Sequence, residues 1–438
     1  MKSEQVGSRA VFKHRLGIIA GFCACILLVL SGCGTSNTTK DSVTLEFWTL
    51  QMDAFKDTLQ PMFAEYERQH PGVRIHWVDV PFSEGPKRVL TAMMSSHVPD
   101  VVNLNPDFSA ILANRQALVD MQHALPEEAI QKYLPVAWEA ATLQKADGNQ
   151  ITFGLPWYIT SSVTLYNQAI LKKAGLSQPP STFQELPAFA ETIRKKTGAY
   201  GLMPMIADGG NFLKELQKMG IPLYNERGRA SFATPRAVEL LARYVRMYRD
   251  GVVPKESITE GHQAAVGRYQ AGTLAMFSVG PNFLKIVKEN APQVYEQTGI
   301  APQFPRDARF KDFSMMVLVV PRKSAHPKEA VEFAAFITNA RNQLALAKAA
   351  PVLPSITEAL ADSYFTEAAA GDRMALGRKI SAAQLVQAKE AYRIQPNQNA
   401  INERISYHVQ MALLGRLSPE TALQQAQQQI NQILETEF

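Results

Sequence analysis

Between residues 43 and 104, hydrophobic and polar residues follow a pattern of short strands separated by amphipathic helices. Period-two alternation or a short apolar run predicts strands at residues 43–48, 73–78 and 100–104. The helix predicted after the first strand has its apolar residues on one face: Leu59, Met62, Phe63 and Tyr66. A second helix is predicted at about residues 86–96. This order predicts a parallel sheet with crossover helices, whose ligands lie beyond the carboxyl ends of the strands.

Downstream, helix starts are marked by capping signals. Thr182 to Glu185 match a capping box, Thr234-Pro235 open a helix that ends at Gly251, and Ser418-Pro419 open the last helix. Asp147-Gly148, between Leu143 and the apolar run that starts at Ile151, predicts a hairpin turn. The chain is therefore expected to fold as α/β, with enough residues for two domains.

The first 33 residues have the three zones of a signal peptide. Four basic residues precede an apolar run over residues 16–30, which is shorter than the roughly 20 residues needed to span a bilayer. Leu30-Ser31-Gly32-Cys33 resembles the lipobox of bacterial lipoproteins. The resemblance implies removal of residues 1–32, lipidation of Cys33, and a flexible tether over residues 33–41. The alternative is a free thiol that follows an apolar run by chance.

Cysteine content and charge narrow the classes of function. All three cysteines, Cys23, Cys25 and Cys33, lie near the leader, so no disulfide is expected and the core must stabilise the fold. Removal of residues 1–32, with four basic residues and one acidic residue, lowers the formal charge from +5 to +2. This near balance gives no reason to expect nucleic-acid binding. No metal and no cofactor are expected, because the histidines never pair at zinc-ligand spacing.

Several local patterns, in this order, resemble the family of extracellular solute-binding proteins that serve carbohydrate ABC importers. They are a strand ending in Phe47-Trp48, a helix ending in His70 to Val73, Pro99 to Val102, Gly154 to Pro156, Lys173 to Leu176, Pro179 to Phe183, Ala275 to Pro281, Val319 to Ser324, and a closing helix at Leu417 to Leu434. The chain departs from the family at Asn282, where an aromatic residue is usual, and at residues 313–316, which replace paired glycines.

The resemblance implies a two-lobe periplasmic-binding-protein fold, with hinged lobes and a ligand cleft between them. Lobe I is expected to comprise residues 42–155 and 281–315, and lobe II residues 156–280 and 316–438. The first crossing between the lobes follows Pro156, and the second is at Ala275 to Pro281. Such a protein is exported, anchored by lipid at the periplasmic or cell-surface side of a membrane, monomeric, and a partner of the permease subunits of an ABC importer. Its lobes close on the ligand.

A sugar presents hydroxyls around its edge and apolar C–H faces, so its site combines carboxylates and amides with aromatic rings. Asp107 lies seven residues after Asp100, the spacing of a sugar-binding aspartate in the maltose-binding relative. Thr160 stands where that relative has a ligand-contacting glutamate, which argues against the same sugar. The full set of candidate ligand-binding residues is Trp48, Gln51, Asp107, Trp157, Tyr158, Thr160, Ser161, Asp208, Asn211, Phe212, Asn282, Phe283, Ser314 and Met315.

Several candidates also fit a structural role. Asp107 suits the N-cap of a helix that starts near Phe108. Trp48, Trp157 and Tyr158 suit packing, and the loop from Asp208 to Phe212 suits an ordinary polar turn before a helix.

Three other functions compete with sugar import. A protein that binds non-sugar cargo, such as a phosphorylated polyol or a small peptide, would use an arginine clamp for an anion; the candidate loops contain no Arg or Lys, although Arg393 could reach a cleft. A ligand sensor would use the same closed form. A lipid-anchored glycoside hydrolase would need two facing carboxylates, such as Asp107 and Asp208. In a hinged site these would rather share the hydroxyls of an uncleaved ligand, so no catalytic residue and no enzyme activity are predicted.

Overall fold

The computed structural model describes residues 42–438, apart from residues 96, 145–148, 307, 309, 389–391, 393, 396 and 436–438. The predicted leader, Cys33, the tether, the turn residues Asp147 and Gly148, and Arg393 lie outside the described residues. None of the helices that the described residues form combines the length and the apolar character needed to cross a membrane.

A six-stranded sheet with the order β11-β6-β10-β3-β1-β2 forms the centre of the first lobe. β1 pairs in parallel with β2 and β3, which confirms the predicted parallel strands, whereas β6 and β10 pair antiparallel to each other. The strands are β1 (Val43–Leu50), β2 (Val73–Val80), β3 (Val101–Leu104), β6 (Leu155–Ser161), β10 (Phe313–Val319) and β11 (Leu353–Pro354). A hairpin of β4 (Thr142–Gln144) and β5 (Gln150–Thr152) lies apart from this sheet.

Both faces of this sheet are buried. Val101 and Val102 are adjacent on β3 and belong to separate cores, because successive side chains of a strand point to opposite faces. On one face, the ring of Phe47 packs against Phe63 and Phe333, with centroids 5.8 and 5.3 Å apart. The first-lobe helices are α1 (Lys56–Gln69), α2 (Gly85–Met94), α3 (Pro106–Asn114), α4 (Met121–Ala124), α5 (Glu127–Ile130), α6 (Pro135–Ala140), α14 (Pro327–Ile337), α15 (Ala340–Ala349), α16 (Thr357–Leu360) and α17 (Ser363–Thr366), with a 3-10 turn at Asp53–Phe55.

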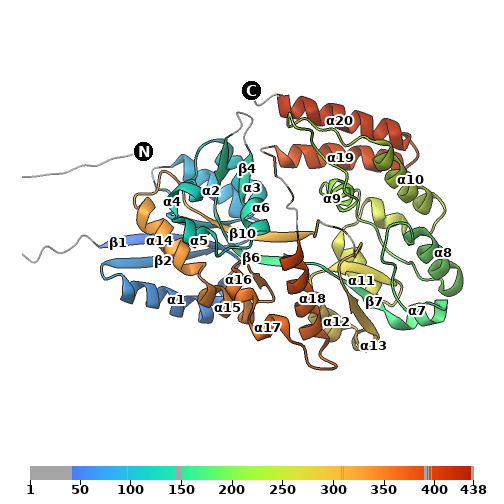
Figure 1. Cartoon of the computed structure of the whole chain (residues 1–438), viewed down its shortest axis with the longest axis horizontal. Coiled ribbons are helices and arrows are strands. Elements are labelled where there is room, and N and C mark those ends of the chain that lie inside the picture. Colours follow the sequence, from blue (N-terminus) through green and yellow to red (C-terminus); the bar gives the residue numbers. More distant parts are fainter. Residues whose placement is uncertain are drawn as a thin grey trace, which may run out of the picture. The chain divides into compact units, whose positions relative to one another are not determined.

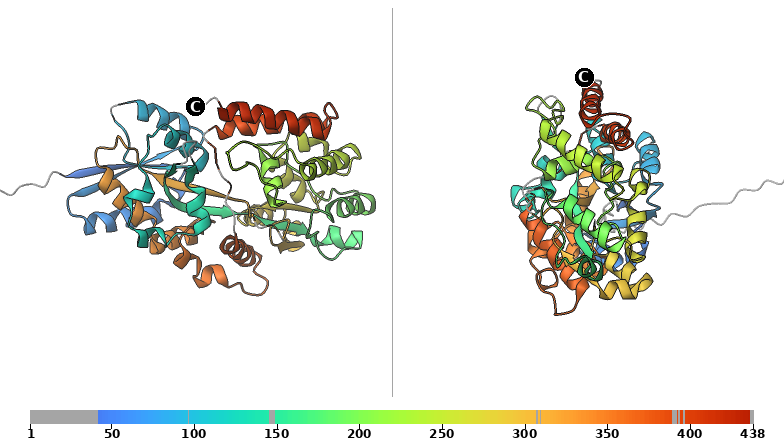
Figure 2. Two further views of the ribbon diagram at one scale, coloured as in Figure 1. Left: turned by 45° about the horizontal axis from the view of Figure 1, so that its top comes forward. Right: turned by 90° about the vertical axis from the view of Figure 1, so that its right-hand side faces the viewer.

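The second lobe contains a three-stranded antiparallel sheet of β8 (Met276–Val279), β7 (Val163–Asn167) and β9 (Thr298–Ala301), with β7 in the middle. Its helices are α7 (Gln168–Ala174), α8 (Leu186–Thr197), α9 (Asn211–Lys218), α10 (Pro235–Arg249), α11 (His262–Gln270), α12 (Phe283–Asn290), α13 (Pro292–Glu296), α19 (Gln398–Leu413) and α20 (Pro419–Glu435), with a 3-10 turn at Lys255–Ile258. Figure 2 shows α19 and α20 packed side by side. Thr234 caps α10, as predicted, through its Oγ1, which accepts a hydrogen bond from the N–H of Ala237.

The chain passes from one sheet to the other between β6 and β7, and returns between β9 and β10 (Figure 1). Helix α18 (Arg373–Gln387) follows the first-lobe helix α17. This packing corrects the predicted division of the lobes. Residues 281–301 belong with the second lobe, because β9 pairs with β7, and no crossing occurs at Ala275 to Pro281. Residues 316–366 belong with the first lobe, because β10 pairs with β3 and α14 packs on Phe47.

Candidate functional site

A pocket of about 180 Å³ lies where the two sheets meet, and it contains five of the predicted ligand-binding residues. We call it the crossing-strand pocket; it is lined by Thr160, Ser161, Ser162, Gly280, Asn282, Phe283, Asp312, Phe313 and Ser314. Antiparallel pairing of β6 with β10 places Thr160 opposite Ser314 and Ser161 opposite Phe313. The loop after β8 supplies Gly280 and Asn282 from the second lobe. Hydroxyl, amide, carboxylate and aromatic groups therefore converge on one small space.

One hydroxyl of this pocket is buried without a hydrogen bond to any described residue, and one amide lies close to a glycine. Ser161 is 1% exposed, and within the described part of the chain its Oγ has no hydrogen-bond partner. A buried hydroxyl left in this state costs about 1–3 kcal/mol, which a ligand hydroxyl could recover. The amide of Asn282 approaches Gly280 closely, because a Cβ added at Gly280 would lie 2.4 Å from Oδ1 of Asn282. The unsatisfied hydroxyl of Ser161 is a feature that a polar ligand would explain.

The charge of Asp312 in this pocket is balanced by the second lobe. Nζ of Lys214, on α9, lies 3.1 Å from Oδ1 of Asp312. Burial alone would raise the pKa of the Asp312 carboxyl, but the ammonium groups of Lys214 and Lys218 outweigh it and hold that pKa below its ordinary value. Lys218 in turn pairs with Glu215 at 2.8 Å. The ion pair therefore provides the crossing-strand pocket with a carboxylate that carries little uncompensated charge.

Asp107 lies in the first turn of α3 and interacts electrostatically with Lys214. Burial raises the pKa of its carboxyl, while the ammonium of Lys214 acts in the opposite direction. The helix is capped by Asn105, whose Oδ1 accepts a hydrogen bond from the N–H of Phe108 at 2.8 Å. This corrects the alternative role considered for Asp107, and leaves its carboxylate free of any capping bond.

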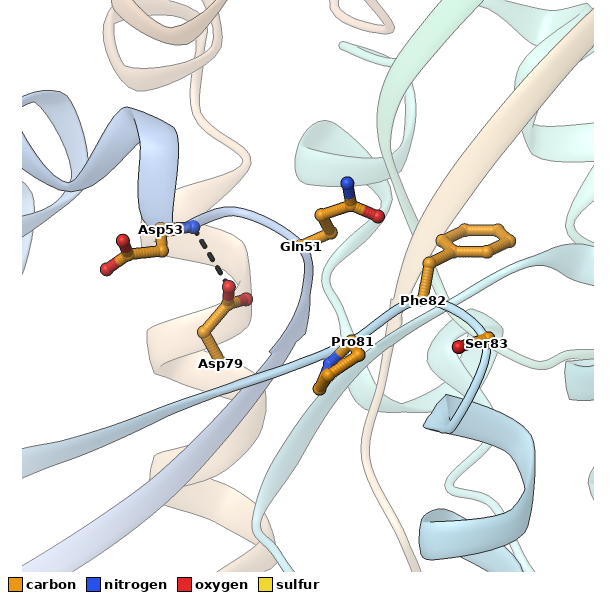
Figure 3. A pocket seen from close by; sticks show the side chains of 6 residues that line it. All are labelled: Gln51, Asp53, Asp79, Pro81, Phe82 and Ser83. Carbon is orange, nitrogen blue, oxygen red and sulfur yellow. Dashed lines mark hydrogen bonds between the residues drawn. The ribbon is translucent and has the colours of Figure 1, made fainter.

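A second, more open pocket lies at the carboxyl ends of β1 and β2, where the strand order predicts ligands. Its volume is about 690 Å³, and Gln51 is the predicted residue in it. Figure 3 shows Asp79 turned toward the backbone N–H of Asp53, whereas the side chains of Gln51 and Phe82 extend away from this pair. Gln51 has φ of 56°, one of two non-glycine residues with positive φ among those described. Such strained backbone often accompanies a binding site.

The loop from Asp208 to Asn211 is docked on α19. The N–H of Gly210 donates to Oγ of Ser406, and Nδ2 of Asn211 donates to the carbonyl of Met205. Asp208 is exposed, and a Cβ added at Gly261 would lie 3.3 Å from its Oδ2. The neighbouring ring of His262 stacks edge-on against Phe283 of the crossing-strand pocket, with centroids 4.7 Å apart, and burial lowers the pKa of this histidine. Asp208 thus belongs to the same side of the second lobe as this pocket.

Other candidates line neither of these two pockets. Trp157, Phe212 and Met315 are at most 5% exposed and pack in the cores, so their prediction as ligand contacts is corrected to a packing role. Tyr158 is partly buried beside Met52 and Asp79. Trp48 lies in a separate groove, where its Nε1–H donates to Glu46 and the guanidinium of Arg88 sits 5.4 Å from its ring.

Sequence reasoning missed Lys214 and Asp312. Lys214 follows Asn211 by three positions on α9, so helical spacing could have placed it near the predicted loop. Asp312 directly precedes β10 and lies two residues before the predicted candidate Ser314, so its position next to that candidate was the available signal. Among the described residues, no three His, Cys, Asp or Glu side chains gather in a way that could hold a metal ion.

A family model of bacterial extracellular solute-binding proteins matches residues 53–344. A solved structure from Synechococcus sp. MITs9220, assigned by name to the oligosaccharide periplasmic-binding proteins, is 33% identical with a TM-score of 0.82; the match covers 90% of this chain and 100% of that one. An uncharacterized lipoprotein of Streptomyces antibioticus is 25% identical, over 77% of this chain and 76% of its own. A protein of Escherichia coli K12, assigned by name to the ABC transporter periplasmic-binding proteins, is 20% identical over 76% of each chain.

Proposed function

The chain belongs to the bacterial extracellular solute-binding proteins, and we propose that it captures an uncharged sugar or sugar-like polyol in the crossing-strand pocket. It is the solute-binding component of an ABC transporter, and its family and relatives are binding proteins. The nature of the solute, the closure of the lobes on it, the lipid anchor and the absence of turnover belong to the proposal.

One observation carries the proposal of a hydroxyl-rich solute. The crossing-strand pocket combines four hydroxyl side chains, an amide, a charge-balanced carboxylate and the rings of Phe283 and Phe313. Hydroxyls can both donate to and accept from these polar groups, and the apolar face of a sugar ring can pack on a phenyl ring. The buried Oγ of Ser161, which has no partner in the described part of the chain, supports a ligand that supplies one.

The size and charge of the pocket support a small neutral group. Its volume of about 180 Å³ corresponds to roughly six water molecules, which favours one sugar ring in the pocket over an oligosaccharide. The two ammonium groups that act on Asp312 are already paired, Lys218 with Glu215 and Lys214 with the Asp312 carboxylate itself. An anionic cargo would have to displace that carboxylate, so a neutral solute is favoured over a phosphorylated polyol.

A thermal-shift screen tests this function on the chain from Asp41 to Phe438. The screen contains mono-, di- and trisaccharides, polyols and sugar phosphates. A solute that binds only the native state raises the melting temperature, so we expect one monosaccharide or polyol to raise it. Asn282→Ala should remove most of that shift, whereas Asn399→Ala, a matched change at an exposed amide of α19, should retain it. A shift by sugar phosphates alone would support the rival cargo, and no response to any of these solutes would refute the proposal.

The lipid anchor rests on Cys33, outside the described residues. The lipobox-like segment supports it, as does the Streptomyces antibioticus relative, which is named a lipoprotein. Cys33→Ser should move the protein from the membrane fraction to the soluble one, and intact-mass analysis should lose the mass of the acyl groups. A wild-type chain without added lipid mass would contradict the anchor.

We expect the captured sugar to leave unchanged, because the carboxylate that lines the pocket is held in an ion pair. Asp312 is paired with Lys214, so it is not free to act as a base. Steady release of reducing sugar from an oligosaccharide, abolished by Asp107→Ala, would instead indicate a glycoside hydrolase.

A further inference from the structure

Helix α18 lies against both lobes at the points where the chain crosses between them. Its residues Ala382 and Leu385 pack in a core of the first lobe, whereas Met374 and Ile380 pack against a core of the second. An added Cβ at Gly377 would lie 3.0 Å from Cβ of Pro281, so the helix also approaches the segment after β8 closely. A helix in this position can affect how the two sheets are held relative to each other.

Hydrogen bonds from α18 hold the first crossing. Ser161 and Ser162 join β6 to β7, and their carbonyl groups accept bonds from Oγ of Ser381 at 2.8 Å and from Nε2 of Gln384 at 2.9 Å. Ser381 is fully buried and Gln384 is 5% exposed. These bonds are therefore shielded from water, and losing one would leave a buried polar group unsatisfied.

The same glutamine also reaches the second crossing. Oε1 of Gln384 accepts a hydrogen bond from the backbone N–H of Gln303, which follows β9. The side chain of Gln303 then holds both backbone groups of Asp312: its Nε2 donates to the carbonyl at 2.9 Å, and its Oε1 accepts from the N–H at 2.8 Å. Gln303 is 2% exposed. Two buried glutamines thus connect Ser162 on one crossing with Asp312 on the other.

Both ends of this connection are walls of the crossing-strand pocket, but neither glutamine lines it. From this geometry we propose that Gln384 and Gln303 are positioning residues for solute binding. They fix the two crossings relative to each other, so that Ser161, Ser162 and Asp312 form one pocket and the lobes move as units about a defined hinge. The inference relies on the proposed function for the role of the pocket, but it concerns the ligand-free hinge and is tested there.

The test measures the distance between the lobes by pulsed electron resonance in ligand-free protein. In the full chain with Cys23, Cys25 and Cys33 replaced by serine, spin labels are placed at Met94→Cys on α2 and Lys195→Cys on α8, both exposed. Gln384→Met keeps the side-chain length and removes both hydrogen bonds. We expect the distribution of interlobe distances to become at least twofold wider, and amide exchange at Gln303 to become at least tenfold faster.

Two controls separate positioning from general stability. Gln387→Met, the same change at an exposed position of α18, should leave the distribution as in the unsubstituted chain. Ile193→Val, in the core of the second lobe, should lower the melting temperature without widening the distribution of interlobe distances. Should Gln384→Met not fold, Ser381→Ala removes only the hydrogen bond from α18 to the carbonyl of Ser161. It should widen the distribution of interlobe distances, but by less than is expected for Gln384→Met. An unchanged distribution in a folded Gln384→Met or in Ser381→Ala would overturn the inference, while leaving the sugar proposal untouched.

Discussion

Replacing Lys214 with methionine would remove the cation that balances Asp312 and keep most of the side-chain volume. The ammonium lies 3.1 Å from the carboxylate, and the two side chains are 25% and 26% exposed. Lys218 remains nearby, but it is paired with Glu215. The variant therefore leaves Asp312 as a largely buried carboxylate with a weaker electrostatic partner.

The size of the effect follows from the distance and the exposure. Two unit charges at this separation attract by about 5 kcal/mol at an effective dielectric constant of 20. Removing one partner of a fully buried pair costs about 3–5 kcal/mol, and an exposed pair contributes less than about 1 kcal/mol. With both side chains one quarter exposed, we expect Lys214→Met to lower the free energy of unfolding by about 2 kcal/mol at pH 7. For a chain of this length, that lowers the melting temperature by about 2 °C.

The loss should depend on pH in a defined direction. The folded chain lowers the pKa of Asp312, so its ionised form stabilises the fold above the unfolded pKa of about 3.9, and this contribution disappears as pH falls through the folded value. Without Lys214, burial pushes the pKa of Asp312 upward. The difference between wild type and variant should therefore be largest near neutral pH and should shrink below about pH 4.

Urea unfolding followed by circular dichroism, from pH 7 to pH 3.5, measures this difference. The matched control is Arg249→Met, which removes an exposed pair with Asp250 and should cause no measurable change. In the double variant Lys214→Met with Asp312→Asn, part of the lost stability should return, because no unpaired buried charge remains. A Lys214→Met variant as stable as wild type at pH 7, or equally impaired at pH 3.5, would refute this account of the pocket's charge balance.

Three further variants test other groups. Asp107→Asn should raise the free energy of unfolding at pH 7 by about 1 kcal/mol and have no effect near pH 3.5. The reason is that a carboxyl with a raised pKa stabilises the fold below its unfolded pKa and loses this contribution as pH rises through the folded value. Melting curves at both pH values measure the difference, and an equal difference at the two values would contradict the reasoning. Ser161→Ala should leave the ligand-free melting temperature within about 1 °C, since Oγ of Ser161 has no partner among the described residues. The same change should weaken binding of the responding sugar about three- to tenfold by calorimetric titration, and unchanged affinity would remove Ser161 from the site. His408→Leu should increase the free energy of unfolding by about 1 kcal/mol in urea, because both ring nitrogens of this buried residue lack partners within the described chain; a destabilised variant would point to a polar contact.

Local patterns predicted the elements better than the site. Spacing of apolar residues identified the parallel strands, and capping signals identified the helices opened by Thr234 and Ser418, because both signals act within a few residues. The helix cap near Asp107 was missed, although Pro106 marks the first helical position and makes Asn105 the capping residue.

The prediction of ligand contacts was wrong on a strand whose successive side chains point to opposite faces of the sheet. Trp157 and Tyr158 are adjacent on β6, so their side chains point to opposite faces and could not both face one cleft. The alternation alone does not reveal which face is a core when both faces are covered by helices, and Trp157 proved to be in the core against Phe47.

The contacts of Gln303 and Gln384 between the two crossings could not be predicted from the sequence, for a different reason. Gln303 and Gln384 are 81 residues apart, and their hydrogen bond depends on how α18 packs between the lobes. The division of the lobes has the same cause. It depends on the pairing of β9 with β7, which assigns β9 to the sheet of the second lobe. Such long-range pairings leave no periodic signal in one sequence.

A crystal structure of the protein with the sugar that responds in the thermal-shift screen would decide whether the crossing-strand pocket is where solute binds. We predict density for one sugar ring between Thr160, Asn282 and Phe313, with a ligand hydroxyl within 3 Å or so of Oγ of Ser161. Density confined to the groove beside Trp48 or to the pocket at Gln51, with the crossing-strand pocket empty, would contradict the account.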